Sequence, residues 1–416
     1  MRNDVPRGNS LETTRRTESF KYTRPVAILT GGGDRPYAVG LAAAIIDQDI
    51  PFDFIGSDDL DFPELHRHPS VRFLNLRGCQ RTDVSTAAKA WRLSVYYLRL
   101  IVYAANTKAK VFHLLWNNKF EIFDRTFLLL YYKLLQKQLA FTVHNVNAAS
   151  RDGNDSAINR LTLRIQYYLV DHLFVHTEKM KRELMDEFGV PFRKISVIPF
   201  GINSTVPNTD LTPVEARRLI DVSAGAKTLL FFGNIAPYKG LEYLLEALSI
   251  LTQSDPEYKL LIVGRPKGCQ PYWQEIRQRI DAGKLQPYIF ERIEFVPDED
   301  TEIYFKAADV LVLPYTFIFQ SGVLFLAYNF GVPVIAADVG SMRDDIVEGK
   351  TGLIFRPRDS TDLAKTISSH FASALHKDLG TERRAIRDYA NERYSWAKVG
   401  EITNKVYQSL ADNPNL

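Results

Sequence analysis

The segment that decides the fold is residues 228–241, TLLFFGNIAPYKGL, just past the middle of the chain. Its first five residues form a mostly apolar run, which is typical of a strand buried on both faces of a sheet. Gly233 follows the run, and a helical pattern over 240–252 comes shortly afterwards. The segment therefore predicts a strand–loop–helix unit whose loop lies at the carboxyl end of the strand, where open α/β sheets bind ligands.

The same alternation continues on both sides of this segment. In the second half we predict strands at 228–232, 259–263, 293–296, 310–313 and 333–336, with helices at 240–252, 271–283, 301–307, 322–330 and 360–373. In the first half we predict strands at 26–30, 51–55, 71–76, 111–115, 140–143 and 172–175, with helices at about 86–107, 123–137 and 157–168. Short apolar strands separated by helices predict two parallel sheets, each covered on both faces.

The domain organisation follows from these two series. We predict an α/β protein made of two doubly wound Rossmann-like domains that face each other across a cleft. Their expected limits are 25–203 and 214–390, joined by a polar, Pro-containing linker at 204–213. Residues 391–416 are expected to form a helix that crosses back to the first domain, and the polar residues 1–24 a disordered leader.

Size and charge narrow the class of protein. The chain has 416 residues, more than one hydrophobic core usually organises. Residues 1–200 hold 28 Lys and Arg against 21 Asp and Glu, whereas residues 201–416 hold 24 against 28. The basic first half favours an anionic partner, but the acidic second half argues against nucleic acid, which needs a basic stripe with stacking aromatics. Two distant cysteines and the lack of a signal or spanning segment predict a cytoplasmic protein.

A glycine triplet follows the first predicted strand. Gly31, Gly32 and Gly33 precede a helix, and glycines there let the backbone pass close to a phosphate. The spacing is not G-x-G-x-x-G, which disfavours a dinucleotide fold. The functional interpretation makes Gly32 and Gly33 contacts of a donor substrate. The alternative is a tight turn that needs positive φ, and both interpretations stay open.

A second pattern predicts an anion site in the second half. Lys239 stands at the start of a helix, where its ammonium can meet a diphosphate. Residues 314–326, PYTFIFQSGVLFL, follow a strand and start another helix, which Ser321 is expected to cap. The N–H groups of Gly322 and Val323 would then point at the same anion, because both loops lie at one edge of one sheet.

These segments lie within a longer resemblance to a known family. FFGNIAPYKGLEYLLEAL, LLIVGRPKG, IEFVPDEDTEIYFKAADVLVLPY, SGVLFLAYNFGVPVIAADVGS and IVEGKTGLIFRPRDSTDLAKTI resemble, in order and spacing, the C-terminal half of family 4 retaining glycosyltransferases. FTVHN (141–145), LFVHTEKMKRELMDEFGV (173–190) and VIPFGIN (197–203) resemble the first half of the same family. The resemblance runs from about Val26 to Ser409. It implies the B-type fold of two Rossmann-like domains, a sugar nucleotide in the cleft, no metal or cofactor, and retention at the anomeric carbon.

The resemblance also implies roles for individual residues. Lys239 matches the family's diphosphate lysine, and His144 matches a histidine that contacts the donor sugar, although a buried structural histidine is the alternative. The remaining donor contacts are expected from Gly233, Asn234, Gln320, Ser321, Gly322 and Val323, with Val296 and Pro297 at the nucleobase. We expect the acceptor to meet the loops of the first domain, at Gly32, Gly33, Asp34, Trp116, Asn117 and Lys119.

Two departures from the family pattern affect the donor site. Asn234 stands where the family usually has an arginine, five residues before the lysine. Ile318 and Leu326 stand where it usually has two glutamates, the second of which accepts hydrogen bonds from the ribose. The pattern SGV-x-x-LAY resembles a branch of the family, in which we expect Gln320 or Ser321 to supply the missing polar contacts.

The function expected from these residues is transfer of a hexose from a UDP- or GDP-sugar to a hydroxyl of a glycan or lipid-linked glycan, in bacterial cell-surface polysaccharide assembly. No side chain is an obvious nucleophile, so retention is expected from same-face attack in which the leaving diphosphate takes the acceptor's proton. Two alternatives stay open. A non-catalytic sugar-nucleotide-binding subunit fits the loss of both glutamates, and a sugar-nucleotide epimerase of the same fold would need carboxylates in the cleft.

Two other features have competing interpretations. Asp59 and Asp61 imitate a metal-holding Asp-x-Asp, and His66 and His68 lie nearby, but no further ligand stands at metal spacing, so we predict a solvated loop. Two helical segments of the first half mix aromatic and basic residues, which favours either core packing with charged ends in solvent or a face resting on an anionic membrane. Those residues are Trp91, Tyr96, Tyr97, Arg99, Tyr103, Phe127, Tyr131, Tyr132, Lys133 and Lys137.

Overall fold

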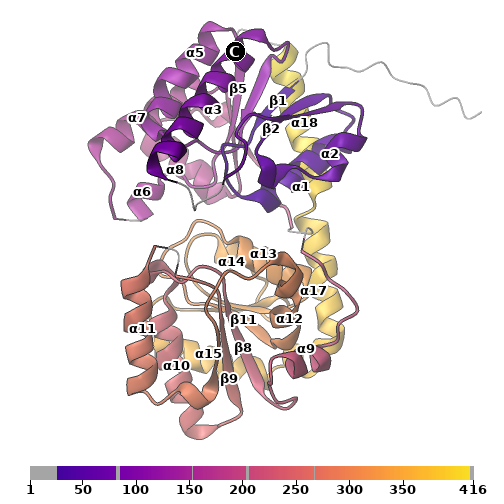
Figure 1. Cartoon of the computed structure of the whole chain (residues 1–416). Coiled ribbons are helices and arrows are strands. Elements are labelled where there is room, and N and C mark those ends of the chain that lie inside the picture. The colour runs from indigo at the N-terminus through magenta and orange to yellow at the C-terminus, as the bar shows by residue number, and fades with distance from the viewer. Residues whose placement is uncertain (1–25, 81–84, 152, 203–205, 267, 413–416) are drawn as a thin grey trace, which may run out of the picture.

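The computed structural model describes residues 26–80, 85–151, 153–202, 206–266 and 268–412. It contains two α/β domains, drawn one above the other in Figure 1 with the N-terminal domain at the top. The predicted leader, 1–24, lies outside the described residues, and so does the segment 203–205 between the domains.

The N-terminal domain is built on seven parallel strands in the order β3-β2-β1-β4-β5-β6-β7. All four residues of β1 are buried because they alternate between two cores: Val26 and Ile28 pack towards α1, whereas Ala27 and Leu29 pack towards α3. Its strands are β1 (Val26–Leu29), β2 (Phe52–Gly56), β3 (Val71–Asn75), β4 (Val111–Leu114), β5 (Gln138–Thr142), β6 (His172–Val175) and β7 (Ile195–Val197). Its helical segments are α1 (Arg35–Ile46), η1 (Asp58–Leu60), α2 (Pro63–Arg67), α3 (Thr86–Asn106), α4 (Glu121–Phe123), η2 (Asp124–Leu128), α5 (Leu129–Leu134), α6 (Ala148–Arg151), α7 (Ala157–Leu169), α8 (Glu178–Phe188) and η3 (Phe192–Lys194).

The C-terminal domain repeats this plan with six parallel strands in the order β10-β9-β8-β11-β12-β13. Its strands are β8 (Lys227–Phe232), β9 (Tyr258–Val263), β10 (Ile289–Arg292), β11 (Val310–Leu313), β12 (Val334–Ala337) and β13 (Gly352–Phe355). Its helical segments are α9 (Pro213–Leu219), η4 (Pro237–Lys239), α10 (Leu241–Ser254), α11 (Gln270–Ala282), η5 (Gln286–Tyr288), α12 (Asp298–Ala307), α13 (Gly322–Asn329), α14 (Met342–Asp345), α15 (Ser360–Ala372), α16 (Ala374–Lys377) and α17 (Leu379–Arg393). The fold class predicted from the sequence, two doubly wound domains, is confirmed.

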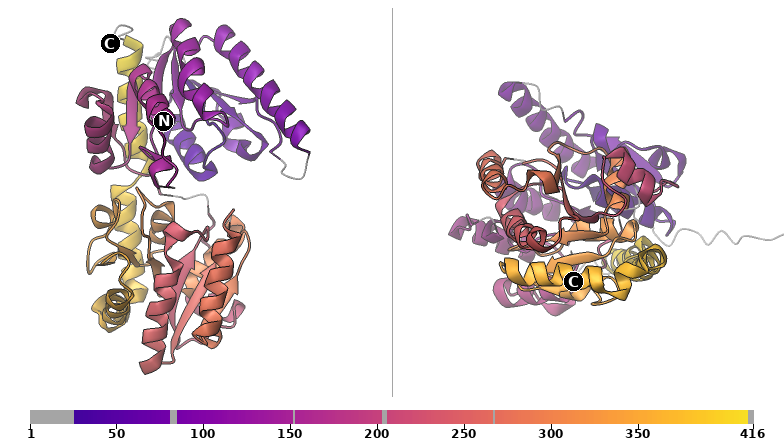
Figure 2. Two further views of the ribbon diagram at one scale, coloured as in Figure 1. Left: turned by 90° about the vertical axis from the view of Figure 1, so that its left-hand side faces the viewer. Right: turned by 90° about the horizontal axis from the view of Figure 1, so that it is seen from below.

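The last helix, α18 (Trp396–Asp412), leaves the C-terminal domain and runs along the N-terminal one, as Figures 1 and 2 both show. Val399 and Val406 of α18 join the core formed by β1 and α1, and the Tyr407 hydroxyl lies 2.6 Å from Nδ1 of His113 on β4. Gly400 permits close packing, because a Cβ there would lie 2.7 Å from the carbonyl oxygen of Ala44 on α1. The C-terminal helix is therefore part of the N-terminal core.

The predicted elements differ from the structure in several places. The strand expected at 293–296 is wrong: the strand is β10, which pairs with β9 through Ile289–Arg292, and 293–297 form the loop that follows it. The helix expected at 123–137 is divided into α4, a π turn and α5, which ends at Leu134. The strands β7 and β13 were not predicted, because each lies at the edge of its sheet, where the sequence is less constrained.

Candidate functional site

The cleft between the domains lies where the strand order of each sheet reverses. In the N-terminal sheet this point falls between β1 and β4, and in the C-terminal sheet between β8 and β11. The loops after β1, β8 and β11 line two adjoining cavities of about 350 and 720 Å³, and both volumes are in the usual range for small-molecule sites. We call the first the Ser321 pocket and the second the Val296 pocket. The two share Asp34, Pro36, Asn234, Lys239 and Val323.

Lys239 is held in the wall common to both cavities. It ends the short 3₁₀ turn η4 and is separated from α10 by Gly240, so it lies just outside the helix that it was predicted to open. Its side chain is buried, and Nζ donates a 2.5 Å hydrogen bond to the hydroxyl of Tyr315. Burial raises the pKa of the Tyr315 phenol, so the hydroxyl that accepts from Lys239 stays neutral.

Close backbone packing fixes the position of η4. Gly240 has φ of 64°, and a Cβ there would lie 2.0 Å from the carbonyl oxygen of Pro314, the residue after β11. The N–H of Thr316 donates to the carbonyl of Tyr238 at 2.9 Å. The loop after β8 therefore packs directly against the loop after β11, and this contact places Lys239 near the start of α13.

The start of α13 supplies unpaired backbone donors. In the described structure the N–H groups of Gly322 and Val323 have no backbone or side-chain acceptor, and both residues line the Ser321 pocket. The predicted side-chain cap is wrong: Ser321 occupies the N-cap position, but its hydroxyl lies 3.4 Å from that of Tyr315 instead of accepting from the helix. A row of polar groups thus runs from Lys239 through Tyr315 to Ser321.

The Val296 pocket is formed by the loops that follow β8, β9 and β10. Gly233 and Gly264 allow the first two loops to touch, since a Cβ on Gly264 would lie 1.7 Å from the carbonyl oxygen of Gly233. Val296 lines the pocket as expected, whereas Pro297 lines neither cavity. The carbonyl of Pro297 accepts from the Thr301 hydroxyl at 3.0 Å and from an N–H in the first turn of α12, so this carbonyl is already hydrogen-bonded within the protein.

Sequence reasoning did not identify several residues of this pocket. Arg265 follows Gly264, and its guanidinium lies 5.1 Å from the ring centre of Phe295, which is 61% exposed. Phe295 was hidden by the wrong strand at 293–296, which assigned it to a sheet. Arg35 of the N-terminal domain also lines the pocket and approaches Asp298 at 3.7 Å across the cleft.

Gln320 has an unsatisfied oxygen in the Ser321 pocket. Its Nε2 donates to Oδ2 of Asp345 at 3.4 Å, which fixes the orientation of the amide. Its Oε1 is buried and has no hydrogen-bond partner among the described residues. Ile318 and Leu326, which occupy the positions of the family's glutamates, line the same pocket with apolar side chains. Gln320 therefore offers a buried oxygen that can accept from a ligand hydroxyl.

The glycine triplet forms a tight turn between two side chains. Gly31 and Gly32 have φ of 59° and 76°, so the turn needs glycine for conformational reasons. A Cβ on Gly33 would lie 1.9 Å from the ring of Trp116, and one on Gly32 would lie 1.8 Å from the Arg77 guanidinium. Gly33 lines the Val296 pocket, whereas Gly32 lines neither cavity.

Asp34, directly after the triplet, caps α1 and faces both cavities. Its carboxylate accepts from the N–H of Tyr37 at 3.3 Å. The walls of the cleft raise the pKa of this carboxyl by desolvation, although the side chain itself remains open to solvent. Asp34 is the carboxylate that the two cavities share.

His144 lies behind the cleft wall and lines neither cavity, which differs from the prediction that it faces the cleft. Its ring stacks on Trp116, with centroids 4.3 Å apart, and meets the ring of Tyr37 edge-on at 4.6 Å. Nδ1 lies 3.2 Å from Nε2 of His176, and the buried Nε2 has no partner among the described residues. Burial and the neighbouring His176 hold the pKa of His144 well below its usual value, so the ring is neutral.

The predicted acceptor residues separate into two groups. Asp34 lies in the cleft, and Trp116 lies beneath the glycine turn beside His144. Asn117 instead forms a reciprocal amide pair with Gln166 at 2.8 and 3.3 Å. Lys119 lines a different cavity on the N-terminal domain, together with Arg77.

Comparison with known proteins agrees with this architecture. The B-type fold of two Rossmann-like domains around a cleft also occurs in Anabaena Alr3699/HepE in complex with UDP, with a TM-score of 0.71 at 15% identity over 93% of this chain and 100% of that one. Sucrose-phosphate synthase from Thermosynechococcus elongatus has a TM-score of 0.70 at 19% identity over 93% of this chain and 99% of that one.

Two protein-family profiles match this chain: "Glycosyltransferase Family 4" over residues 32–206 and "Glycosyl transferases group 1" over residues 226–373. The chain belongs to the family 4 glycosyltransferases, as the sequence predicted.

Among curated relatives, D-inositol 3-phosphate glycosyltransferase of Geodermatophilus obscurus is 29% identical over 252 residues, which is 58% of this chain and 53% of the relative. The Corynebacterium efficiens protein of the same name is 27% identical over 276 residues, 64% of this chain and 62% of the relative. The chain thus spans a little over half the length of these relatives.

Proposed function

We propose that this protein is a retaining hexosyltransferase that moves a hexose from a nucleoside-diphosphate sugar to a hydroxyl of a glycan or lipid-linked glycan acceptor. The observation that carries the proposal is the convergence of the Lys239 ammonium and the free N–H groups of Gly322 and Val323 on one cavity between the domains. A diphosphate in this position meets a positive charge and a helix N-terminus together. Both stabilise the negative charge that develops on the leaving group.

In the proposed reaction the bond between the anomeric carbon and the diphosphate oxygen breaks as the acceptor oxygen bonds to the same carbon from the same face. The acceptor's proton passes to an oxygen of the departing diphosphate, and the nucleoside diphosphate leaves. The neutral imidazole of His144 is a poor proton acceptor, because burial holds its pKa low. We therefore assign His144 to supporting Tyr37 and Trp116 at the cleft wall.

Gln320 replaces part of the missing carboxylate function in this proposal. Its Oε1 is buried and unpaired among the described residues, and a buried acceptor gains most when a ligand hydroxyl donates to it. The Asp345 carboxylate keeps the amide oriented with Oε1 free. Asn234 lines both cavities where the family usually has an arginine, so Lys239 carries more of the charge neutralisation.

The donor is expected to be a UDP- or GDP-hexose. Anabaena HepE, which shares the fold, is described in complex with UDP, so UDP-sugars are the first candidates. In the Val296 pocket, the exposed ring of Phe295 and the adjacent Arg265 offer a surface on which a nucleobase can stack.

A thermal-shift series with UDP-, GDP-, ADP- and dTDP-hexoses tests donor binding, since a ligand that binds the native state raises the melting temperature. The expected result is a shift with one nucleotide that is lost in Lys239→Met. If the nucleotide that shifts the wild type shifts Lys239→Met equally, the phosphate site is misassigned. EDTA is expected to leave turnover unchanged, because Lys239 and the α13 amides supply the positive charge. Loss of turnover that Mg²⁺ restores would contradict this.

Turnover separates the transferase from its main alternative, a non-catalytic subunit that binds a sugar nucleotide. The apolar Ile318 and Leu326 in the Ser321 pocket favour that alternative. Release of free nucleoside diphosphate together with a glycosylated product supports the transferase. Tight donor binding with no release of nucleoside diphosphate, in the presence of lipid-linked acceptor extract, would support the subunit.

We further propose that the protein works in cell-surface polysaccharide assembly, in the cytoplasm at the inner face of the membrane, with the N-terminal domain as the contact. Helix α3 exposes Trp91, Leu98 and Val102, whereas Tyr96 and Tyr97 of the same helix belong to the core. The neighbouring segment α4–η2–α5 adds further exposed apolar side chains, at Phe120, Ile122, Phe127, Leu130 and Leu134. We call these eight side chains the apolar face. Within the described residues there is no helix apolar and long enough to span a bilayer, so this contact would be peripheral.

A further inference from the structure

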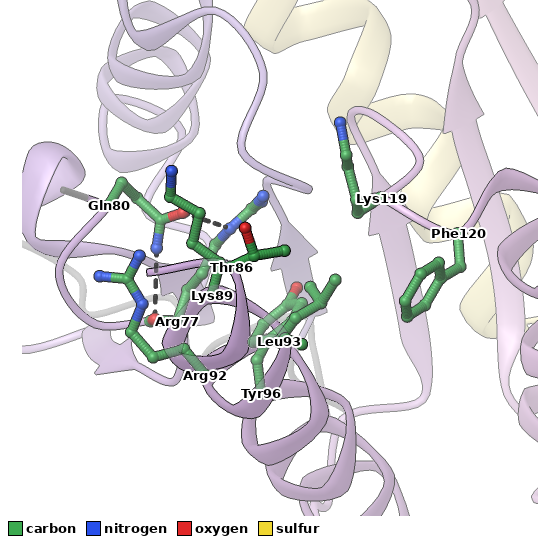
Figure 3. A pocket seen from close by; sticks show the side chains of 10 residues that line it. Arg77, Gln80, Thr86, Lys89, Arg92, Leu93, Tyr96, Lys119 and Phe120 are labelled. Carbon is green, nitrogen blue, oxygen red and sulfur yellow. Dashed lines mark hydrogen bonds between the residues drawn. The ribbon is translucent and has the colours of Figure 1, made fainter. Parts of the chain in front are cut away.

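A second concave site lies on the N-terminal domain, outside the cleft. Residues 77–80, the first turns of α3 and the loop after β4 form this cavity of about 550 Å³. We call it the lateral pocket. Figure 3 shows Lys119 and Phe120 on the opposite side of the opening from the other lining residues. Its lining residues are Arg77, Gln80, Thr86, Lys89, Ala90, Arg92, Leu93, Tyr96, Lys119 and Phe120.

The lateral pocket concentrates positive charge. Four of its lining residues are Arg or Lys, and none of the lining residues in the described structure is acidic. Arg77, Lys89 and Lys119 form no ion pair with a described carboxylate. Like charges gathered around one cavity repel one another, and an anionic ligand relieves that repulsion. The pocket therefore favours an anion.

Arg77 is held in a fixed position at the edge of the pocket. Its Nε donates to Oε1 of Gln80 at 3.2 Å, and its guanidinium lies 5.5 Å from the ring centre of Tyr96. Its Nη1 is buried against Gly32 and has no hydrogen-bond partner among the described residues. The guanidinium charge is therefore fixed beside the pocket, and phosphate is the kind of group that a guanidinium binds well.

The rest of the lateral pocket is apolar. Leu93, Tyr96 and Phe120 form this part, which fits an uncharged hydrocarbon better than a hydrated ion. Lys119 and Phe120 also line an adjoining hollow with Ile122 and Phe127, both members of the apolar face. A ligand that fills the whole site thus has an anionic head group and an apolar chain that continues towards this face.

The lateral pocket and the cleft lie on opposite sides of the glycine turn. Gly32 rests against the Arg77 guanidinium, whereas Gly33 and Asp34, the next two residues, line the Val296 pocket. Lys119 likewise follows Trp116, which lies under the turn. A molecule anchored by its anion in the lateral pocket is therefore separated from the donor cavity by the thickness of one backbone turn.

We propose that the lateral pocket binds the phosphate or diphosphate group of an amphiphilic acceptor, with Arg77, Lys89, Arg92 and Lys119 around the anion and the apolar chain directed along Phe120. The acceptor role rests on the transferase function proposed above. The binding chemistry, a phosphate ester on an apolar chain, does not, so the two can fail separately.

The test uses geranyl diphosphate, a soluble probe with both features, and measures its dissociation constant by calorimetry on the full-length protein. Lys89 and Lys119 are exposed, so Lys89→Gln/Lys119→Gln should fold normally, which its melting temperature checks. We expect this double variant to bind the probe about tenfold more weakly, the order for losing two partly solvated charge contacts. Its affinity for the donor nucleotide should not change.

The matched control is Lys108→Gln/Lys179→Gln, which removes the same charge from exposed sites outside the pocket. Lys108 follows the far end of α3, about 15 Å along the helix from the last lining residue. The control should bind geranyl diphosphate like the wild type. Equal affinity of the pocket variant and the control, or binding of uncharged geraniol as tight as that of geranyl diphosphate, overturns the proposal.

Vesicles distinguish an acceptor site from contact with bilayer head groups. Saturable binding of geranyl diphosphate in the absence of lipid, together with competition against turnover, supports an acceptor site. Binding to phosphatidylglycerol vesicles without any saturable binding of the soluble probe overturns it in favour of bilayer contact alone. Probe binding without transferase turnover would leave the phosphate site standing while the proposed function fails.

Discussion

The two domains share one strand order but use the same point of the sheet differently. In the C-terminal domain, the loops after β8 and β11 bring an ammonium and free N–H groups to the cleft. In the N-terminal domain, the equivalent loops after β1 and β4 are filled by Trp116, which stacks on His144 under the glycine turn. The fold thus provides the position, and the side chains in two loops decide whether it offers an anion site, as we propose for the C-terminal domain, or an aromatic wall.

The sharpest test of this contrast compares cations from the two domains that face the same cleft. Lys239→Met should lower kcat by at least about 10²-fold, the usual cost of removing one preorganised donor from a developing oxyanion. Arg35→Met should change kcat little, because Arg35 is largely exposed and its 3.7 Å ion pair with Asp298 is solvated. Steady-state kinetics of both variants measure this, and equal losses would remove the distinction between the domains.

A second test concerns the contact between the loops after β8 and β9 in the C-terminal domain. Gly264→Ala combines φ of 144° with a Cβ 1.7 Å from the Gly233 carbonyl oxygen, so the backbone must move. We expect it to lower the free energy of unfolding by about 2–4 kcal/mol and to weaken donor binding. Gly349→Ala is the control, because Gly349 also has positive φ but no atom within 4 Å of its Cβ position. It should cost about 1 kcal/mol, measured by urea unfolding, and leave donor binding intact. Equal effects of the two substitutions would contradict the role of the contact.

Acid is expected to weaken the N-terminal domain more than the C-terminal one. His113 is fully buried, and burial lowers its pKa to about 3, so the unfolded chain binds the proton first. Above about pH 6.5 the His113 ring is neutral in both the folded and the unfolded chain. Between pH 6.5 and 3 only the unfolded chain takes up the proton, so the free energy of unfolding falls, by about 2 kcal/mol at pH 5. Burial also lowers the pKa of three further histidines of this domain, His144, His172 and His176.

Urea unfolding of the wild type and His113→Gln at pH 7 and pH 5 measures this effect. The variant should lose about 2 kcal/mol less than the wild type on acidification, whatever its stability at pH 7. An identical loss in both proteins would show that the His113 ring does not stay neutral in the fold.

The smallest expected effect concerns the outer surfaces. Leu134→Ser in the apolar face should reduce flotation with phosphatidylglycerol vesicles a few-fold, since it removes one exposed leucine, 82% accessible, from the contact. Leu219→Ser, at a 62% exposed leucine of the C-terminal domain, should have no effect on flotation. If Leu219→Ser reduced flotation more than Leu134→Ser, the membrane contact would lie on the C-terminal domain and the proposal would be wrong.

Much of the fold was predictable because buried parallel strands are short apolar runs with little ambiguity. The error at 293–296 shows the limit: Ile293, Phe295 and Val296 resemble a strand, but pairing with β9 selects Ile289–Arg292, an edge strand of mixed polarity. Edge strands have one free side, so their sequences are less constrained, and β7 and β13 were missed for the same reason.

The site was predictable where it depends on one loop and not where several loops meet. Lys239 and the start of α13 follow from local sequence, and the structure places both in one cavity. The lateral pocket joins Arg77, Lys89 and Lys119 from three separate segments, and no local pattern connects them. The position of His144 behind Tyr37 likewise depends on how α1 packs.

The return of α18 has a mechanical consequence for the cleft. The chain passes between the domains twice, and both passages meet at Trp396, whose Nε1 donates to the Ile202 carbonyl at 2.8 Å. Its ring leaves no space for a Cβ on Gly40 of one domain or on Gly201 at the crossing, each of which would lie 2.2 Å away. One indole therefore packs at both connections and also lines the Ser321 pocket, so the linkage between the domains and one wall of the cleft depend on the same side chain.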